Sequence, residues 1–279
     1  MQKGSTLFLT MLAVGVVTAQ LWEFEQVDTM STGRVTVCRH PDGRTILGYG
    51  AVGLIRLAWK DSTWHYESTG CPGRSDFCIG PDGTMGIAYV PSDSARLCYA
   101  MRTDTGWQHE TLPWCTDGGT PRLGMGPEGC PGILYVLRDD TLLLSALLLA
   151  SRTQDSWRLD TVWAVVGTPG AYFGAYGFAY DTLGRASGLY RRWRMEPNSR
   201  DDLHIFYPGG GQLLVMGFEN YIGSAVMGLE PGGRWAALYS NVVFDTIDWL
   251  YYRDSDPESG VCLDSSALAA AVGFDTAGR

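Results

Sequence analysis

Five tyrosines stand at one fixed offset from five tight-turn glycines, and this repeat constrains the fold more than any other feature of the chain. Each repeat holds a short apolar run, a turn that ends in Gly, and a second run in which a Tyr follows that Gly by six residues. The pairs are Gly43/Tyr49, Gly83/Tyr89, Gly129/Tyr135, Gly184/Tyr190 and Gly233/Tyr239, and a sixth turn glycine stands at Gly278. A period of 40 to 55 residues, built from short strands and turns, is typical of a radial array of small sheets.

Each repeat divides into four expected strands, which predicts an all-β β-propeller with four-stranded antiparallel blades. The first strands, such as Arg74–Ile79, alternate large and small side chains, as expected of a strand packed near a crowded axis. Three fourth strands open on a Trp that an acid follows three residues later: Trp64/Glu67, Trp107/Glu110 and Trp157/Asp160. The turn glycines predict one propeller domain of six blades over residues 20–279.

The sixth repeat is expected to be incomplete. It has a first strand at Ala269–Phe274 and the turn that ends at Gly278, while Trp22–Val27 near the N-terminus matches the fourth-strand pattern. We therefore expect the N-terminal strand to complete the last blade and so remove an open sheet edge. The second and third strands of that blade are predicted to lie in a further segment of a longer protein.

The first 19 residues read as a secretory signal peptide. Lys3 is followed by the apolar run Thr6–Val17 and by the small-residue site Val17-Thr18-Ala19. The run is too short for a membrane span. The pattern predicts an exported protein that is secreted, periplasmic or held at the cell surface.

The net charge, the cysteines and the missing motifs argue against nucleic acid as a partner and against a cofactor or a metal site. A net charge of −9 disfavours binding to nucleic acid. Seven cysteines leave at least one unpaired; a Cys71–Cys115 disulfide and buried free thiols are the alternatives. The acidic run Asp254–Gly260 resembles a calcium loop, but its Gly falls one place late, and no phosphate loop or C-x-x-C pair is present. We predict no cofactor and no metal site.

Three short turns carry a resemblance to a known group. Asp61-Ser-Thr-Trp64, Asp104-Thr-Gly-Trp107 and Asp155-Ser-Trp157 stand between expected third and fourth strands. The chain thereby resembles the exported bacterial propellers related to sialidases, with their Asp-box (BNR) repeats. The turns are shorter than the family motif, so the resemblance concerns architecture and transfers no catalytic residue.

The connections into first strands and between second and third strands share one face, and they vary most between repeats. Because variable loops on a regular scaffold usually carry binding, we predict the site there. Arg34, Arg74 and Arg122 at first-strand starts could form a cationic floor for a carboxylate, as the likeness to sialidases implies; local pairing with Asp76 or Asp117 is the alternative. The candidate sugar-stacking rings are Trp114, Trp163, Tyr172 and Trp193, with Arg194 as a polar partner and core packing as the alternative.

These features predict a binding or scaffold module, for a glycan or a cell-surface partner, rather than an enzyme. The alternative is a carbohydrate-active hydrolase of sialidase-like architecture. A glycosidase needs two carboxylates at a set separation, or a Tyr with an acid, and the sequence selects no such pair.

Overall fold

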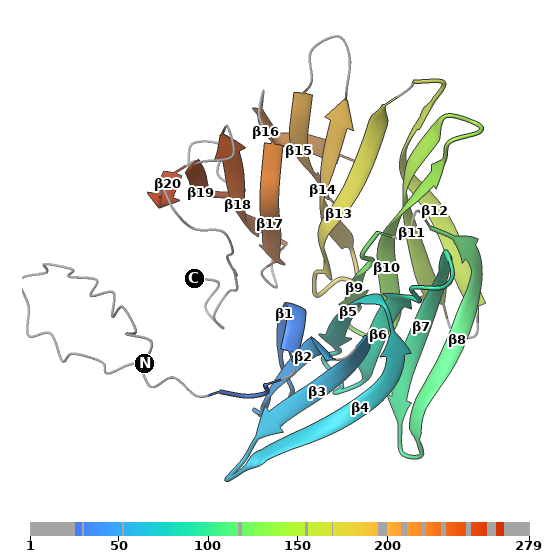
Figure 1. Cartoon of the computed structure of the whole chain (residues 1–279), viewed down its shortest axis with the longest axis vertical. Coiled ribbons are helices and arrows are strands. Elements are labelled where there is room, and N and C mark those ends of the chain that lie inside the picture. The colour runs from blue at the N-terminus through green and yellow to red at the C-terminus, as the bar shows by residue number, and fades with distance from the viewer. Residues whose placement is uncertain are drawn as a thin grey trace, which may run out of the picture.

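The computed structural model describes residues 26–264 except 30, 52, 117–118, 154–155, 169, 195–199, 208–210, 219–220, 230–232, 244–246 and 256–260. Twenty strands in this part form five four-stranded antiparallel sheets, and each sheet keeps its strands in sequence order. Figure 1 shows the sheets fanned around a centre, with β1, β5, β9, β13 and β17 on the inside. The protein is an all-β propeller.

The strands of the five blades have these bounds. Blade 1 comprises β1 (Ser31–Arg39), β2 (Thr45–Ala51), β3 (Leu54–Lys60) and β4 (Trp64–Pro72). Blade 2 comprises β5 (Arg74–Ile79), β6 (Met85–Val90), β7 (Arg96–Thr103) and β8 (Gly106–Cys115). Blade 3 comprises β9 (Arg122–Met125), β10 (Pro131–Asp139), β11 (Leu144–Thr153) and β12 (Ser156–Val166). Blade 4 comprises β13 (Ala171–Tyr180), β14 (Ala186–Arg194), β15 (Arg200–Tyr207) and β16 (Gly211–Phe218), and blade 5 comprises β17 (Tyr221–Leu229), β18 (Trp235–Val243), β19 (Ile247–Asp254) and β20 (Val261–Asp264).

The repeated Gly belongs to the turn between the first and second strands. In blade 2, Gly80 N–H donates to the Thr84 carbonyl at 2.7 Å, and Gly83 N–H donates back to the Gly80 carbonyl at 3.0 Å. Gly83 has φ of 89°, a left-handed conformation that favours glycine. Because the strands are antiparallel, these turns and those between third and fourth strands lie at one end of the blades, here named the turn face. The remaining connections lie on the opposite, loop face.

The repeated Tyr fills the wedge between neighbouring blades. All five are buried, with 1 to 6% of their surface exposed. Four of them pack in cores shared with the preceding blade: Tyr89 with blade 1, Tyr135 with blade 2, Tyr190 with blade 3 and Tyr239 with blade 4. The fixed offset therefore places one large ring in each junction.

A three-residue contact, here named the Trp–acid staple, links blades 1 to 2 and 2 to 3. Trp107 at the start of β8 donates its indole N–H to Glu67 of β4 at 2.8 Å, and Arg102 bonds the same carboxylate at 2.7 Å. In the next junction Trp157 donates to Glu110 at 3.1 Å, with Arg152 at 3.8 Å. Glu67 and Glu110, which stand three residues after Trp64 and Trp107, thus each reach the Trp of the following blade.

The described residues form five blades, not the six that the turn glycines predicted. The expected first strand of a sixth blade, Ala269–Phe274, lies outside the described residues, as does most of Trp22–Val27. In blade 3, β11 begins only at Leu144, because Asp139 accepts hydrogen bonds from Thr141 N–H and Leu142 N–H and holds a turn there. Leu142 is consequently 63% exposed rather than in the core.

Of the two alternatives for Cys71 and Cys115, a disulfide or free thiols, the structure shows free thiols. Every cysteine whose side chain the structure describes is a free thiol. Cys71 is buried in the core between blades 1 and 2, whereas Cys115 is exposed at the end of β8, so the two side chains have different surroundings. Burial raises the pKa of the Cys71 thiol to about 12.

Candidate functional site

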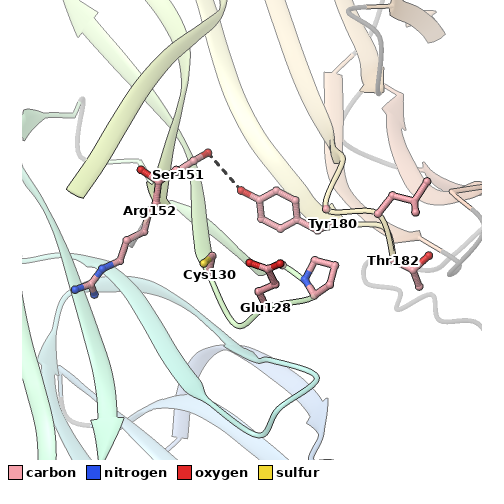
Figure 2. A pocket seen from close by; sticks show the side chains of 11 residues that line it. Glu128, Cys130, Ser151, Arg152, Tyr180 and Thr182 are labelled. Carbon is pink, nitrogen blue, oxygen red and sulfur yellow. Dashed lines mark hydrogen bonds between the residues drawn. The ribbon is translucent and has the colours of Figure 1, made fainter. Parts of the chain in front are cut away.

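A pocket of about 600 Å³ opens on the turn face between blades 3 and 4 (Figure 2). Three segments form its wall: the β9–β10 turn, the end of β11 and the β13–β14 turn. Its polar and aromatic lining includes Glu128, Cys130, Ser151, Arg152, Tyr180 and Thr182.

The β13–β14 turn is held rigidly by Asp181. This buried carboxylate accepts hydrogen bonds from Leu183 N–H and Arg185 N–H, both at 2.9 Å, and from Arg185 Nε at 2.6 Å. Gly184 closes the turn with φ of 73°. The turn therefore fixes the position of Tyr180, the last residue of β13, at the pocket wall.

The Tyr180 ring is fixed on two sides. It packs edge-on against Phe178, with ring centroids 5.1 Å apart, and its hydroxyl lies 3.3 Å from the Ser151 hydroxyl of blade 3. Burial raises the pKa of Tyr180, so the phenol stays neutral at ordinary pH. The ring offers an apolar surface with a polar tip, which suits contact with an amphipathic ligand.

The β9–β10 turn contributes the carboxylate. Gly126 N–H donates to the Cys130 carbonyl at 2.9 Å, and Gly129 N–H donates to the Gly126 carbonyl at 3.0 Å, so the turn repeats the geometry of blade 2. It carries the exposed Glu128, whose side chain lies beside the Tyr180 ring in Figure 2. Glu128 is the sole carboxylate among the described lining residues of this pocket.

Arg152 lines the pocket, but its guanidinium extends toward blade 2 in Figure 2. There it lies 3.8 Å from Glu110 and 6.0 Å from the centre of the Trp157 ring, as part of the staple. The other polar and aromatic side chains that line the pocket are one carboxylate, one aromatic ring, one thiol and the hydroxyls of Ser151, Thr153 and Thr182. This set can hydrogen-bond the hydroxyls of a small polyol while the ring covers its apolar side.

The pocket lies at a junction that lacks the staple. The second residue of β16 is Gln212, where β8 and β12 have Trp107 and Trp157, and Gln212 accepts the Tyr190 hydroxyl at 2.9 Å. Asp160 of blade 3 pairs instead with Arg158 of its own strand, at 2.8 Å.

The predicted arginines whose side chains the structure describes line two different pockets. Arg74 is exposed and lines a loop-face pocket of about 480 Å³, whereas Arg122 is 9% exposed and lines another of about 210 Å³. Arg122 Nε donates to the Ala175 carbonyl at 2.9 Å. The side chain of Arg34 lies outside the described part of the chain, so a cationic floor made by all three arginines stays a prediction.

The predicted aromatic residues lie on strands rather than loops. Trp114 lies on β8 and packs against the core between blades 2 and 3. Tyr172 and Trp193 are directly paired across β13 and β14, because that hairpin continues to Ala171 and Arg194.

The rings of Tyr172, Trp193 and Trp163 already have partners within the fold. Tyr172 stacks on Trp193 at 5.2 Å between centroids, and the Arg138 guanidinium lies 4.2 Å from the Tyr172 centroid. The Arg192 guanidinium lies 5.3 Å from the Trp163 centroid. The predicted polar partner, Arg194, lies 3.8 Å from Asp202. These partners occupy part of the ring surface that a sugar would need.

Sequence reasoning missed the turn-face pocket because it assigned binding to the loop face. Two signals pointed to it. Tyr180 places a large ring directly before the turn, and the fourth repeat lacks the Trp that opens the fourth strand in the first three repeats.

Comparison with solved structures places the chain among β-propellers. It is similar to the α-L-arabinofuranosidase Arb93A of Fusarium graminearum in complex with an iminosugar inhibitor (TM-score 0.56, 10% identity, 82% of this chain and 80% of that one). It is also similar to a fucose-specific lectin from Aleuria aurantia (TM-score 0.52, 11% identity, 82% and 77%). A third similar structure is an ulvan lyase of polysaccharide lyase family PL25 (TM-score 0.53, 9% identity, 88% and 72%).

Likeness at these identities establishes the fold alone. No family model and no curated protein matches the chain, so membership of the sialidase-related group is not shown. In the described ranges no helix is long and apolar enough to cross a membrane. No group of three or more His, Cys, Asp or Glu side chains there could hold a metal ion.

Proposed function

We propose that this protein is a glycan-binding β-propeller, and that a neutral sugar binds in the turn-face pocket between blades 3 and 4. The observation that carries the proposal is that the Tyr180 ring and the Glu128 carboxylate both line one pocket of about 600 Å³. Such a volume suits a small saccharide. The ring would cover the C–H face of the sugar while Glu128 accepts hydrogen bonds from its hydroxyls.

Propellers with this fold both bind and cleave carbohydrates, as the lectin and the arabinofuranosidase illustrate. Binding fits the pocket better than hydrolysis. Most glycosidases use two carboxylates about 5–9.5 Å apart, and sialidases use a Tyr nucleophile with an acid. The described lining of this pocket offers Glu128 as its single carboxylate. It also holds Tyr180, but burial raises the pKa of that phenol and so disfavours the ionised form that a nucleophile needs.

The setting of the proposed function is outside the cell. The signal-peptide pattern of residues 1–19 supports export, and glycans or glycosylated surface proteins are then the partners within reach. The Asp-box-like turns keep the sialidase-related propellers as the proposed relatives of this chain.

Glycan-array screening followed by titration of the best ligand tests the proposal. Glu128→Gln and Tyr180→Ala should each weaken binding at least ~10-fold, which corresponds to the loss of about 1.4 kcal/mol. The matched control is Trp193→Ala on the loop face, which should leave the affinity unchanged. Loss of binding in Trp193→Ala with retention in Glu128→Gln would move the site to the loop face.

Two further outcomes would overturn the proposal. An array without any bound glycan would remove the glycan-binding function itself. Turnover of fluorogenic glycosides that disappears in Glu128→Gln would replace it with the hydrolase alternative.

A further inference from the structure

Arg152 is the one cation among the described residues that line the turn-face pocket, where Glu128 is the one carboxylate. Figure 2 shows that the Arg152 guanidinium nevertheless extends away from Glu128, toward blade 2. There it lies 3.8 Å from the carboxylate of Glu110 on β8. The pocket therefore keeps its two opposite charges apart, although an ion pair between them would be favourable.

The alternation of β11 sets the direction in which the Arg152 side chain starts. Successive side chains of a strand point to opposite faces of the sheet. Ser151 points to blade 4, where its hydroxyl lies 3.3 Å from the Tyr180 hydroxyl, so Arg152 starts toward blade 2. Direction alone does not hold a long, flexible side chain in place. Because Arg152 is the last but one residue of β11 and lies at the pocket rim, its guanidinium needs a partner to keep it on blade 2.

Glu110 is that partner, and its own position is fixed. Its Oε2 accepts the indole N–H of Trp157 at 3.1 Å. Trp157 packs against the core between blades 2 and 3, and its ring lies edge-on to Tyr99 with centroids 5.4 Å apart. The Arg152 guanidinium lies 6.0 Å from the Trp157 ring centroid. The staple that joins blades 2 and 3 thus also sets the position of a residue of the pocket between blades 3 and 4.

The hold on Arg152 is weak compared with the equivalent contact in the other staple. Arg102 Nε lies 2.7 Å from Glu67, whereas Arg152 Nη1 lies 3.8 Å from Glu110. The Glu110 side chain is 46% exposed, against 23% for Glu67. An exposed ion pair of this length is easily broken. Removal of the Glu110 charge should therefore release Arg152.

We propose that Glu110 is a specificity-determining residue of the turn-face pocket: it holds Arg152 on blade 2, so that the pocket selects neutral saccharides over acidic ones. With Arg152 held away, Glu128 accepts hydrogen bonds from sugar hydroxyls and repels the carboxylate of a uronic acid. A released Arg152 pairs with Glu128, which removes the acceptor for a neutral sugar and the repulsion of an acidic one. The inference rests on the proposed function.

A glycan array that carries neutral hexoses beside their uronic acids, glucose with glucuronic acid and galactose with galacturonic acid, tests the inference on the whole chain. The wild type should favour the neutral member of a bound pair. Glu110→Gln should bind the neutral member about 3-fold more weakly and the acidic member about 3-fold more tightly, so that the selectivity falls ~10-fold. Glu67→Gln is the matched control, because it weakens the closer staple, whose cation Arg102 is not among the described lining residues. Its selectivity should equal that of the wild type.

The variant Arg152→Met separates an effect of charge from a structural effect of Glu110. Met keeps an unbranched apolar side chain and lacks the guanidinium, so Glu110→Gln should not change the selectivity further when it is added to Arg152→Met. An equal fall of selectivity with and without Arg152 would overturn the inference.

Three other results are decisive. Unchanged selectivity in Glu110→Gln, or a wild type that prefers the uronic acids, would overturn the inference and leave glycan binding in place. A wild type that binds no member of the array would remove the proposed function itself, and this inference with it.

Discussion

Replacing Glu67 by Gln should destabilise the propeller because one carboxylate oxygen joins two blades. Glu67 Oε1 accepts the Trp107 indole N–H at 2.8 Å and lies 2.7 Å from Arg102 Nε. Gln keeps the shape and an acceptor oxygen, but it removes the charge that both donors face. The expected loss of folding free energy is therefore electrostatic, because the substitution creates no cavity.

The magnitude follows from the two bonds and their exposure. A hydrogen bond to a charged group contributes about 1.5–3 kcal/mol when it is buried, but the side chains of Arg102 and Glu67 are 35% and 23% exposed, which reduces the ion pair toward about 1 kcal/mol. We expect a total loss of about 1–2 kcal/mol. Glu110 is 46% exposed with longer contacts of 3.1 and 3.8 Å, so Glu110→Gln should cost less than about 1 kcal/mol.

Asp160 is the equivalent acid of blade 3 and serves as the comparison without a cross-blade bond. It pairs with Arg158 of its own strand rather than with blade 4. Asp160→Asn should change the free energy of unfolding by no more than ~0.5 kcal/mol. Urea unfolding of the three variants measures the order directly. An Asp160→Asn loss equal to that of Glu67→Gln would refute the claim that the cross-blade bond causes the effect.

Two further predictions concern the turns and the pocket. Hydrogen bonds from the Thr84 side chain and backbone hold the pKa of Asp82 below its usual range, so its stabilising effect is present above the unfolded pKa near ~3.9 and is lost as the pH falls through the folded pKa. The stability difference between wild type and Asp82→Asn should therefore be largest at pH 7 and shrink below about pH 4 in urea unfolding measured at a series of pH values; a difference that stays constant down to pH 3 would contradict this. A Cβ added at Gly132 would overlap the Tyr180 hydroxyl and lie 2.8 Å from its Cζ, so Gly132→Ala should weaken glycan binding although Gly132 does not line the pocket; unchanged affinity in titration calorimetry would contradict this.

The blade architecture could be predicted from the sequence because its signals are local. A turn that needs a left-handed Gly and a Tyr that fills the next junction recur at a short, fixed spacing, as at Gly83 and Tyr89. The acid three residues after each Trp was visible as a pattern too. The partner of this acid could not be predicted, because Glu67 bonds Trp107, which is 40 residues further along the chain. Only the packing of the blades shows that partner.

The site could not be predicted in the same way. Loop variability favoured the loop face, yet the hairpin of β13 and β14 extends far enough to place Tyr172 and Trp193 in paired strands, where they stack on each other. The pocket residues come from two turns and the end of a strand in two blades. No short stretch of sequence contains them together.

The residue near the start of the fourth strand differs between the junctions that have a staple and the junction that has the pocket. Where the following blade supplies a Trp, as at Trp107 and Trp157, the junction is held together by the acid of the preceding blade. Where it supplies Gln212, Asp160 pairs within its own strand and a pocket lies at the junction. Loss of this cross-blade contact, at a cost of about 1–2 kcal/mol, therefore accompanies a concave pocket at the junction of blades 3 and 4.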